Sequence, residues 1–441
     1  MSGSPIIRSG DLRAENRYRI LATLRRDGPL SRTTLGERTS LSQAAISTLS
    51  GQLAIEGVLD GDNGSRPARS ATRPASRDSS PAPAVDGPTR RGRPQTLVAL
   101  EPDSASALIV SLSIDRLRIA LVDYGGTETH VRERGLDTRA LDARTLLRSV
   151  GDSVARLVRQ APPGRIMHIG VAFQGTTANA SGDLLWSPVI GARHVPLGTA
   201  LARRFGVPVT VNNDCALIAR ALRQTHADVL GGSFATLLFR HGVGLGITLD
   251  GQPFAGIHSS ALELGHLPFE RGGARCRCGR HGCIEAYAAD YGIVRLAGSG
   301  PLDADPPGRV DPAELDDLVA AARRGEVPAM QSLAVAGAAV GEGLCMLFML
   351  LDPMPVALVG RSDEALALMN DSLHGTLEAG GHGEPPPVLV GFADGEPLLH
   401  AGTALDALDA LDRRVAARTV AAATDPGARR PARARAAGEP R

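Results

Sequence analysis

The sequence contains no lysine, so all 48 residues counted as lysine or arginine are arginines. Because alanine and glycine are abundant as well, this bias indicates GC-rich coding rather than a function. The chain also lacks an uninterrupted apolar run of about 18 residues, and its start, MSGSPIIRSGDLRAENR, lacks the apolar core of a signal peptide. These absences predict a cytoplasmic protein that does not associate with a membrane.

Cysteine is scarce, with five in 441 residues, yet three lie between Cys276 and Cys283. Thiols stay reduced in the cytoplasm, so clustered cysteines indicate metal ligands rather than disulfides. One imidazole and three thiolates are available here: His266, Cys276, Cys278 and Cys283. This soft set suits tetrahedral zinc, and because it would fill all four positions, the zinc would be structural. The alternative is a loop of reduced cysteines without metal.

The length predicts two to four domains, and residues 11–62 should form the first. An amphipathic helix over Leu12–Arg26 should stop at Gly28, and Ser31 and Ser42 are candidate N-caps of two shorter helices. Two short helices joined by a tight turn form a helix-turn-helix, whose second helix can enter a major groove of operator DNA. The candidate base-contacting residues are exposed near the start of that helix: Ser42, Gln43, Ala44, Ser47 and Thr48. The alternative is a plain helical hairpin in a regulatory bundle.

Residues 63–95 are dense in proline, serine and arginine, which predicts a disordered linker or an enlarged wing loop. Near its end Arg91 and Arg93 flank a glycine, and such a segment can reach phosphates or the minor groove. The tail, residues 424–441, is expected to be disordered.

From residue 96 onward, apolar β-branched runs alternate with helical stretches, which predicts an α/β domain with a largely parallel sheet. A second α/β stretch begins near Phe234, and its glycines are expected to mark a turn between strands: Gly242, Gly244 and Gly246. A helix-rich region follows to about Leu351, and then two short strands.

The run from Glu263 to Tyr287, ELGH followed by CxCGxxGCIExY, resembles the zinc signature of the ROK family of sugar kinases and transcriptional repressors. The resemblance covers residues 11–420, because ROK repressors also carry an N-terminal winged helix-turn-helix. It implies a two-lobed, actin-like ATPase fold with lobe 1 at 96–225, lobe 2 with the zinc loop at 226–395, and a helix at 396–423 that returns to lobe 1.

The same resemblance implies that the zinc loop buttresses a sugar pocket. The implied sugar-binding residues lie in two segments: Asn213, Asp214, Glu263, His266 and Glu285. In the kinases the residue matching Asp214 is the general base. Taken alone, the Asn213-Asp214 pair could also be a turn at a strand end.

The ATP side departs from the kinase pattern. The stretch aligned with the Asp-x-Gly-Gly-Thr phosphate loop has Asp115 but then Arg116 and Leu117, and the adenosine segment has Arg361 in place of a second glycine. The second phosphate loop, at Gly242, retains its glycines. We therefore expect no enzymatic activity and no ATP binding, with Asp214 as the catalytic residue only if the chain is a kinase.

Together these features predict a sugar-responsive transcriptional regulator, most simply a repressor of carbohydrate genes. Its partners would be double-stranded operator DNA and a sugar or sugar phosphate, and it would assemble as a homodimer or homotetramer. The alternatives are a sugar kinase fused to a DNA-binding head and a purely structural interaction module.

Overall fold

The structure is a computed structural model that describes residues 9–60, 96–161, 165–258, 262–298, 300–381 and 388–422. The chain divides into two compact units: unit 1 joins Met1–Ser104 to Asp409–Arg441, and unit 2 is Ala105–Leu408. Residues 63–95, with Arg91 and Arg93, and residues 424–441 lie outside the described residues.

Unit 1 is mainly helical. Its elements are α1 (Ser9–Asp27), β1 (Leu30–Ser31), α2 (Arg32–Thr39), α3 (Gln43–Ile55), β2 (Leu97–Val98), the short helix η1 (Pro102–Ser104) and the last part of α13 (Glu396–Ala422). Both N-caps expected from the sequence are confirmed, because Ser31 accepts a hydrogen bond from the Thr34 amide at 3.1 Å and Ser42 accepts one from Ala45 at 3.2 Å. Between α2 and α3 the chain turns at Ser40, whose φ is 55°.

The end of α13 belongs to unit 1 through ion pairs with α1. Asp412 is fully buried and accepts two hydrogen bonds from Arg25, each at 2.7 Å, while Tyr18 donates to Asp409 at 2.6 Å. β1 pairs antiparallel with β2, which brings residues on either side of the 61–95 segment together. The helix expected to return to lobe 1 therefore contributes its second half to the N-terminal unit.

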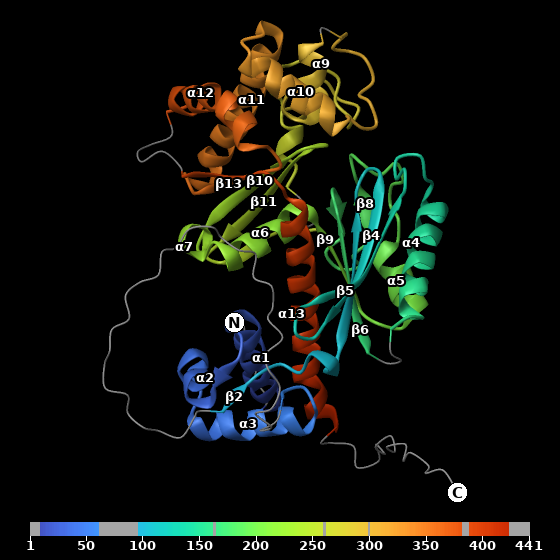
Figure 1. The fold of residues 1–441 in the computed structure, drawn as a ribbon, viewed down its shortest axis with the longest axis vertical. Coiled ribbons are helices and arrows are strands. Elements are labelled where there is room, and N and C mark those ends of the chain that lie inside the picture. The colour runs from blue at the N-terminus through green and yellow to red at the C-terminus, as the bar shows by residue number, and fades with distance from the viewer. Residues whose placement is uncertain are drawn as a thin grey trace, which may run out of the picture. The chain divides into compact units, whose positions relative to one another are not determined.

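The first sheet of unit 2 has the strand order β5-β4-β3-β6-β9. Its strands are β3 (Ser106–Leu112), β4 (Arg116–Asp123), β5 (Glu128–Gly135), β6 (Ile166–Phe173) and β9 (Val209–Asn213). Helices α4 (Ala143–Val158) and α5 (Leu197–Phe205) cover one face, and the first half of α13 covers the other (Figure 1). A methyl group added at Gly170 of β6 would lie 2.9 Å from Ala407, so α13 packs directly on the strand. We call this sheet and its helices lobe 1.

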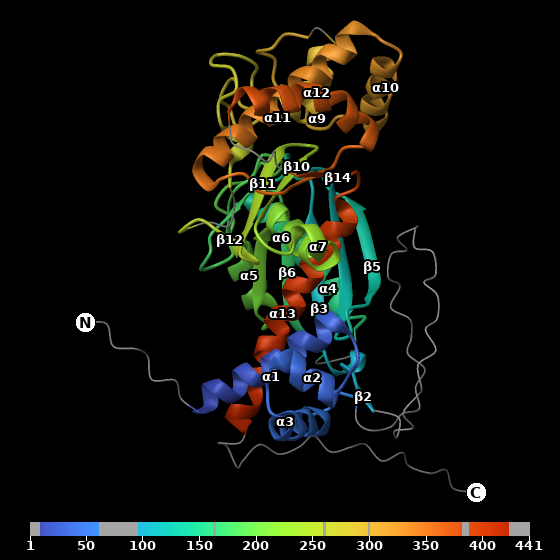
Figure 2. The same cartoon turned by 90° about the vertical axis from the view of Figure 1, so that its left-hand side faces the viewer.

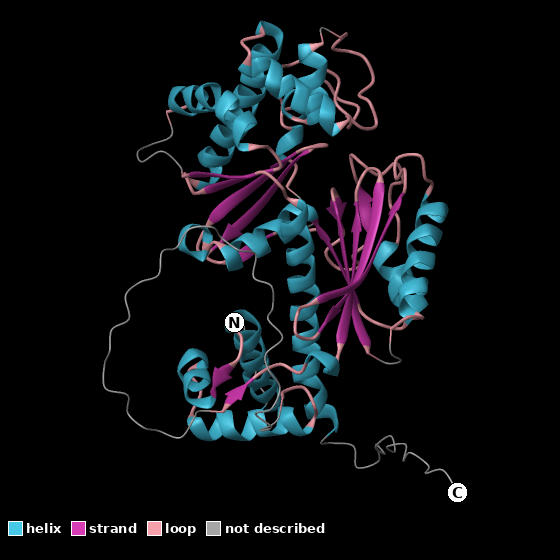
Figure 3. Cartoon of the chain, in the orientation of Figure 1, coloured by secondary structure: helices cyan, strands magenta, loops and turns pink. Residues whose placement is uncertain are grey.

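The second sheet has the order β12-β11-β10-β13-β14 and defines lobe 2. Its strands are β10 (Phe234–Phe239), β11 (Val243–Leu249), β12 (Gln252–Phe254), β13 (Val356–Val359) and β14 (Leu389–Phe392). Helices lie on both of its faces, with α6 and α7 on one and the α8–α12 group on the other (Figures 1 and 3). These helices are α6 (Asp214–Thr225), α7 (Ala227–Leu230), α8 (Glu285–Ala288), α9 (Asp290–Ala297), α10 (Pro312–Arg323), α11 (Val327–Leu351) and α12 (Asp363–Ala379). Figure 2 shows α10, α11 and α12 together from a second direction.

The prediction of largely parallel sheets is wrong. In the first sheet β3–β4 and β4–β5 are antiparallel while β3–β6 and β6–β9 are parallel, and the second sheet has the same mixture. The reason is connection length. Only three residues separate β3 from β4, and so short a link permits only an antiparallel hairpin. A hairpin turn at Gly125-Gly126 joins β4 to β5, and Gly126 has a φ of 97°.

Helix α6 packs on lobe 2, although the expected boundary at residue 225 assigns it to lobe 1. Ile218 and Leu222 are buried with strands β10 and β13. Because Asp214 begins α6 directly after β9 ends at Asn213, the two residues stand where the chain passes from one lobe to the other.

One helix, α11, is long and apolar enough to cross a membrane by length and composition, which the search for uninterrupted runs overlooked. Most of its apolar window, 61%, is buried, and it forms the core of lobe 2 with α12. Its composition is thus that of a core helix.

Candidate functional site

The candidate metal ligands converge in lobe 2. His266 ends the short helix η2 (Leu264–His266), and the three cysteines lie in the loop that leads into α8. Their ligand atoms all lie within 4.8 Å of one another. Gly279 and Gly282 have φ values of 90° and 77°, so glycine is needed for the loop to close around this point.

These four residues fit a zinc ion. A tetrahedral site with Zn–S bonds of about 2.3 Å has sulfur–sulfur edges of about 3.8 Å. Here Cys278 Sγ lies 3.7 Å from Cys283 Sγ, and Cys276 Sγ lies 3.6 Å from Nδ1 of His266. All three thiols are free of disulfides. The spacing and the donor chemistry are therefore those of a closed, structural metal site.

The lobe 1 side of the candidate sugar site is the β9–α6 junction. Asn213 caps α6 by accepting a hydrogen bond from the Cys215 amide, and its amide nitrogen donates to the Gly175 carbonyl at 2.9 Å. Asp214 is buried, and burial raises the pKa of its carboxyl to about 6. The two interpretations of this pair, a turn at a strand end and a ligand site, are thus compatible. Asn213 stabilises the turn by capping α6, and Asp214 is buried directly after it.

The lobe 2 side joins the sugar residues to the metal loop. Nε2 of His266 lies 3.5 Å from Glu263 while its Nδ1 faces Cys276. One ring nitrogen is therefore directed to the candidate sugar residues and the other to the candidate metal ligands. Glu285 is fully buried, lies 3.6 Å from Cys276 Sγ, and accepts hydrogen bonds from Tyr291 and from the Val243 amide. Burial raises the pKa of this carboxyl.

Contacts between the lobes bring the two sides together. Thr176 of lobe 1 donates to Glu263 at 2.8 Å, and the Trp186 and His266 rings meet edge to face with centroids 5.1 Å apart. The sequence reasoning missed Thr176 and Trp186. Trp186 is the only tryptophan in the chain, which was the available signal.

The glycines of the second phosphate loop have two different roles. Gly242 lies in the β10–β11 turn, as expected, but Gly244 and Gly246 lie within β11, so that part of the prediction is wrong. A methyl group at either would lie within about 2.7 Å of Cys215, at 2.6 Å from its Sγ or 2.7 Å from its carbonyl oxygen. Glycine is required at Gly244 and Gly246 because α6 packs directly on β11. Their spacing of two residues places both on the same face of this strand.

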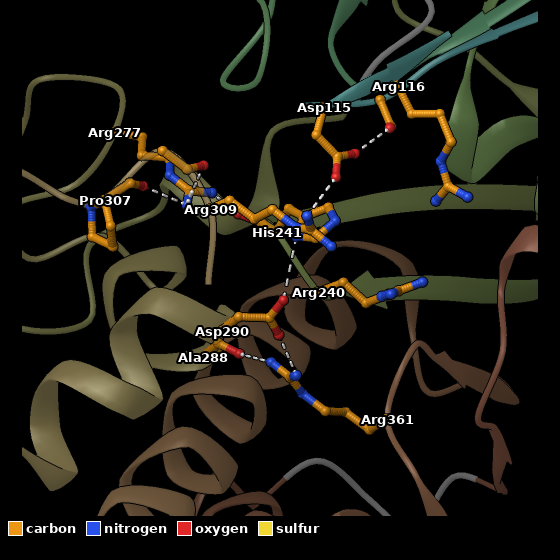
Figure 4. Close-up of polar contacts among 12 residues, drawn as sticks. Asp115, Arg116, Arg240, His241, Arg277, Ala288, Asp290, Pro307, Arg309 and Arg361 are labelled. Carbon is orange, nitrogen blue, oxygen red and sulfur yellow. Dashed lines mark hydrogen bonds and ion pairs between the residues drawn. The ribbon is translucent and has the colours of Figure 1, made fainter. Parts of the chain in front are cut away.

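The two arginines that the resemblance aligns with kinase glycines are engaged in ion pairs. Arg116 lies 2.5 Å from Glu396, and Arg361 is buried with Asp290 and donates to the Ala288 carbonyl (Figure 4). Although burial opposes it, the charge of Arg361 and the contact with His241 hold the pKa of Asp290 well below its usual range.

In unit 1 all five predicted base-contacting residues near the start of α3 are exposed, while Ile46 and Leu49 are buried. Ala44 and Thr48 line a shallow groove with Leu12 of α1, whereas Gln43 bends back toward the Thr33 carbonyl at 3.5 Å.

Residues 110–379 match the model of the ROK family. The xylose repressor of Caldicellulosiruptor bescii is 26% identical over 289 residues, which are 65% of this chain and 66% of that protein. The DNA-binding transcriptional repressor Mlc of Escherichia coli K12 is 27% identical over 298 residues, 64% of this chain and 71% of that protein.

A solved ROK family transcriptional regulator, a homologue of E. coli Mlc, has the same fold. The TM-score is 0.70 at 22% identity, and the match covers 92% of this chain and 99% of that structure. ROK sugar kinases share the fold over about two thirds of this chain.

Proposed function

Because the chain belongs to the ROK family, whose model matches residues 110–379, we propose that it is a sugar-responsive transcriptional regulator, most simply a repressor. The observation that carries the proposal is the contrast within unit 2. The cluster around His266 and Glu285 is complete, whereas arginines stand where phosphate-loop glycines would be. A domain with this composition can bind a polyol but has few groups left for a nucleotide.

The relatives support this function. The xylose repressor and Mlc are named as repressors, and Mlc is named as DNA-binding. For this chain we propose a cytoplasmic location and two partners, operator DNA and a sugar or sugar phosphate.

Sugar hydroxyls would be bound by carboxylates, an amide and an imidazole. Carboxylates accept and amides donate as well as accept, so the set around Asp214 and Glu263 can satisfy vicinal hydroxyls. Zinc, held by His266 and the three cysteines, would keep the loop rigid, and it would supply no reacting group because the protein fills its coordination sphere.

DNA would be read by unit 1 as a winged helix-turn-helix. Helix α3 would enter the major groove, with β1 and β2 as the base of the wing and with Arg91 and Arg93 near the minor groove. Since one head covers few base pairs, a homodimer or homotetramer on an inverted repeat is expected, with half-sites a whole number of helical turns apart.

The test is selection from random double-stranded DNA with the full chain, followed by release assays with xylose, glucose, N-acetylglucosamine and their phosphates. We expect one enriched inverted repeat and at least one sugar that changes its affinity. Replacing Gln43 or Ser47 by alanine should relax base preference by about 1–3 kcal/mol for a good contact. Replacing Arg91 and Arg93 should weaken all sequences and flatten the salt dependence.

Recovery of no motif, or of a motif unchanged in Gln43→Ala and Ser47→Ala, would contradict sequence reading by α3. Glu37→Gln, on α2, is the matched control, because its side chain is exposed outside the proposed contact set.

The kinase alternative predicts a different outcome. It requires sugar-dependent ATP hydrolysis that Asp214→Asn abolishes, since that carboxylate would take the hydroxyl proton. We expect no turnover above background.

A further inference from the structure

Charged side chains from both lobes meet beside the candidate sugar cluster, because His241 immediately precedes the Gly242-Val243 segment that contacts Glu285. Figure 4 shows Asp115 facing Arg309, and Asp290 between His241 and Arg361. These residues come from segments separated by up to 246 positions, so the fold rather than local sequence assembles them.

One ion pair joins the lobes directly. Asp115, in the β3–β4 turn of lobe 1, lies 3.1 Å from Nη1 of Arg309, in the loop before α10 of lobe 2. Both partners are held in place. Ser113 donates to Asp115 at 3.1 Å, and Arg277 donates to the Pro307 carbonyl at 2.8 Å and so fixes the loop that carries Arg309.

A second bridge uses one carboxylate and two arginines. Glu396, at the start of α13, lies 2.5 Å from Arg116 of β4 and 3.9 Å from Arg240 of the β10–β11 turn. Arg116 belongs to lobe 1 and Arg240 to lobe 2, so Glu396 attracts both sides of the cleft.

On the lobe 2 side of this bridge, the backbone that carries Arg240 is anchored. Asp290 donates its backbone N–H to the Arg240 carbonyl at 2.8 Å, and its carboxylate pairs with buried Arg361. His241, the next residue in the turn, lies 3.4 Å from the same carboxylate. Arg240 is therefore presented from an anchored backbone.

We propose that these cross-lobe pairs, Asp115–Arg309 and Arg116–Glu396–Arg240, form an ionic clasp that holds the lobes of unit 2 closed without a nucleotide. Asp115 and Arg116 lie in the stretch that resembles the first phosphate loop, and Arg240 lies just before the second, at Gly242. The positive charges of Arg116 and Arg240, which could attract a phosphate, instead attract a carboxylate of the same chain. The clasp stabilises the closed arrangement of the two lobes, and it acts whether or not a sugar is bound.

Partly exposed pairs are screened by salt and contribute modestly, so the expected effects are graded. Arg309 is 54% exposed and Asp115 32%. Losing this pair should populate the open state about two- to fivefold more. Losing both bridges should raise that to about tenfold.

A backbone hydrogen bond between the lobes reports closure. The Asn179 amide of lobe 1 donates to the His258 carbonyl of lobe 2 at 3.0 Å, so its hydrogen exchange requires separation at that point. The experiment is hydrogen exchange of the full chain without sugar, followed by mass spectrometry of peptides that contain Asn179.

We expect exchange to be faster in Arg309→Gln and Asp115→Arg, and restored toward wild type in the double variant Asp115→Arg with Arg309→Asp. High salt should speed exchange in wild type and have less effect in Arg309→Gln. Arg323→Gln is the matched control, because it breaks the exposed Arg323–Glu364 pair within lobe 2 and should change nothing at Asn179.

Unchanged exchange in Arg309→Gln, or a charge-swapped double variant as open as the single variants, would overturn the clasp. Peptides from α11 must exchange equally in all variants, which separates cleft opening from general destabilisation. Because no sugar or DNA is present, failure here leaves the proposed function untouched, and failure to find a sugar leaves the clasp untouched.

Discussion

Two neighbouring parts of unit 2, the candidate sugar cluster and the charged pairs between the lobes, are built from different kinds of side chains. In the candidate sugar cluster, the carboxylates of Glu263 and Glu285 lie near the His266 imidazole, and Asp214 is buried at the β9–α6 junction. Among the charged pairs, Arg116, Arg309 and Arg361 each meet a carboxylate of the same chain. The first part offers hydrogen-bond acceptors, whereas the second has its charges paired internally.

The difference teaches how binding without phosphate transfer could arise on this fold. Phosphate loops need glycines because backbone N–H groups must approach the phosphates closely. The resemblance to ROK kinases aligns Arg116 and Arg361 with such positions, and both arginines are engaged with carboxylates of the same chain. The candidate sugar cluster has no such replacement, so we propose binding without transfer.

The largest effect is expected when the metal is lost from the loop that carries the candidate sugar residues. Cys278→Ser should lower the zinc content from about one ion per chain to near zero and destabilise unit 2 by several kcal/mol, because metal binding and loop folding are coupled. Elemental analysis and thermal unfolding measure both. Cys345→Ser is the control, since Cys345 is buried but lies outside the metal group. Full zinc retention in Cys278→Ser would refute the ligand assignment.

Among the charged pairs, Arg361→Met should destabilise the protein by about 3–5 kcal/mol, because it leaves the Asp290 carboxylate buried without its arginine partner. The double variant with Asp290→Asn should recover much of that loss, since removing both charges costs less than removing one. Urea unfolding tests this. A double variant no more stable than Arg361→Met would show that the arginine contributes mainly through packing.

A smaller effect is expected on sugar affinity. Glu285→Gln keeps the shape but removes the charge of a buried acceptor, which should weaken the binding of the responsive sugar about tenfold. Calorimetry gives the affinity, and zinc content must be unchanged for the result to count. Glu270→Gln, in the same loop, pairs with Tyr287 and should bind normally. Equal affinity in both variants would place the pocket elsewhere.

The smallest effect is a pH dependence from Asp214. Folding raises the pKa of this carboxyl to about 6, so the folded chain binds the proton more tightly than the unfolded chain does. The free-energy cost of burying the charged carboxylate therefore has its full value above pH 6 and decreases as the pH falls toward 4. The stability difference between Asp214→Asn and wild type should shrink by about 1 kcal/mol from pH 7.5 to 5. A constant difference would mean that Asp214 is not buried in its charged form.

Local features could be predicted from the sequence with good accuracy. The caps Ser31 and Ser42 depend on neighbours three residues away, and the cysteines of the metal loop lie within eight residues. Short-range patterns of this kind determine the local geometry without contributions from distant residues. The sugar residues could be assigned only by resemblance, because Asn213 and Glu285 are 72 positions apart and nothing local links them.

Long-range partners were beyond sequence reasoning. The sequence indicated only that Arg361 stands in place of a second glycine. Its role in an ion pair could not be predicted, because its partner Asp290 lies 71 residues earlier. Gly244 and Gly246 looked like loop residues because their contact with Cys215 depends on the packing of α6. The same holds for Asp412, whose pairing with Arg25 spans 387 positions and assigns the end of α13 to unit 1.

The central claim is that this chain binds a sugar without a nucleotide, and calorimetric titration of the full protein with the sugar panel tests it most directly. Each titration is run alone and with magnesium and ATP. The account predicts that at least one sugar binds with the same affinity in both conditions and that ATP alone produces no binding heat. A sugar whose binding requires ATP, or that releases phosphate from it, would contradict the account.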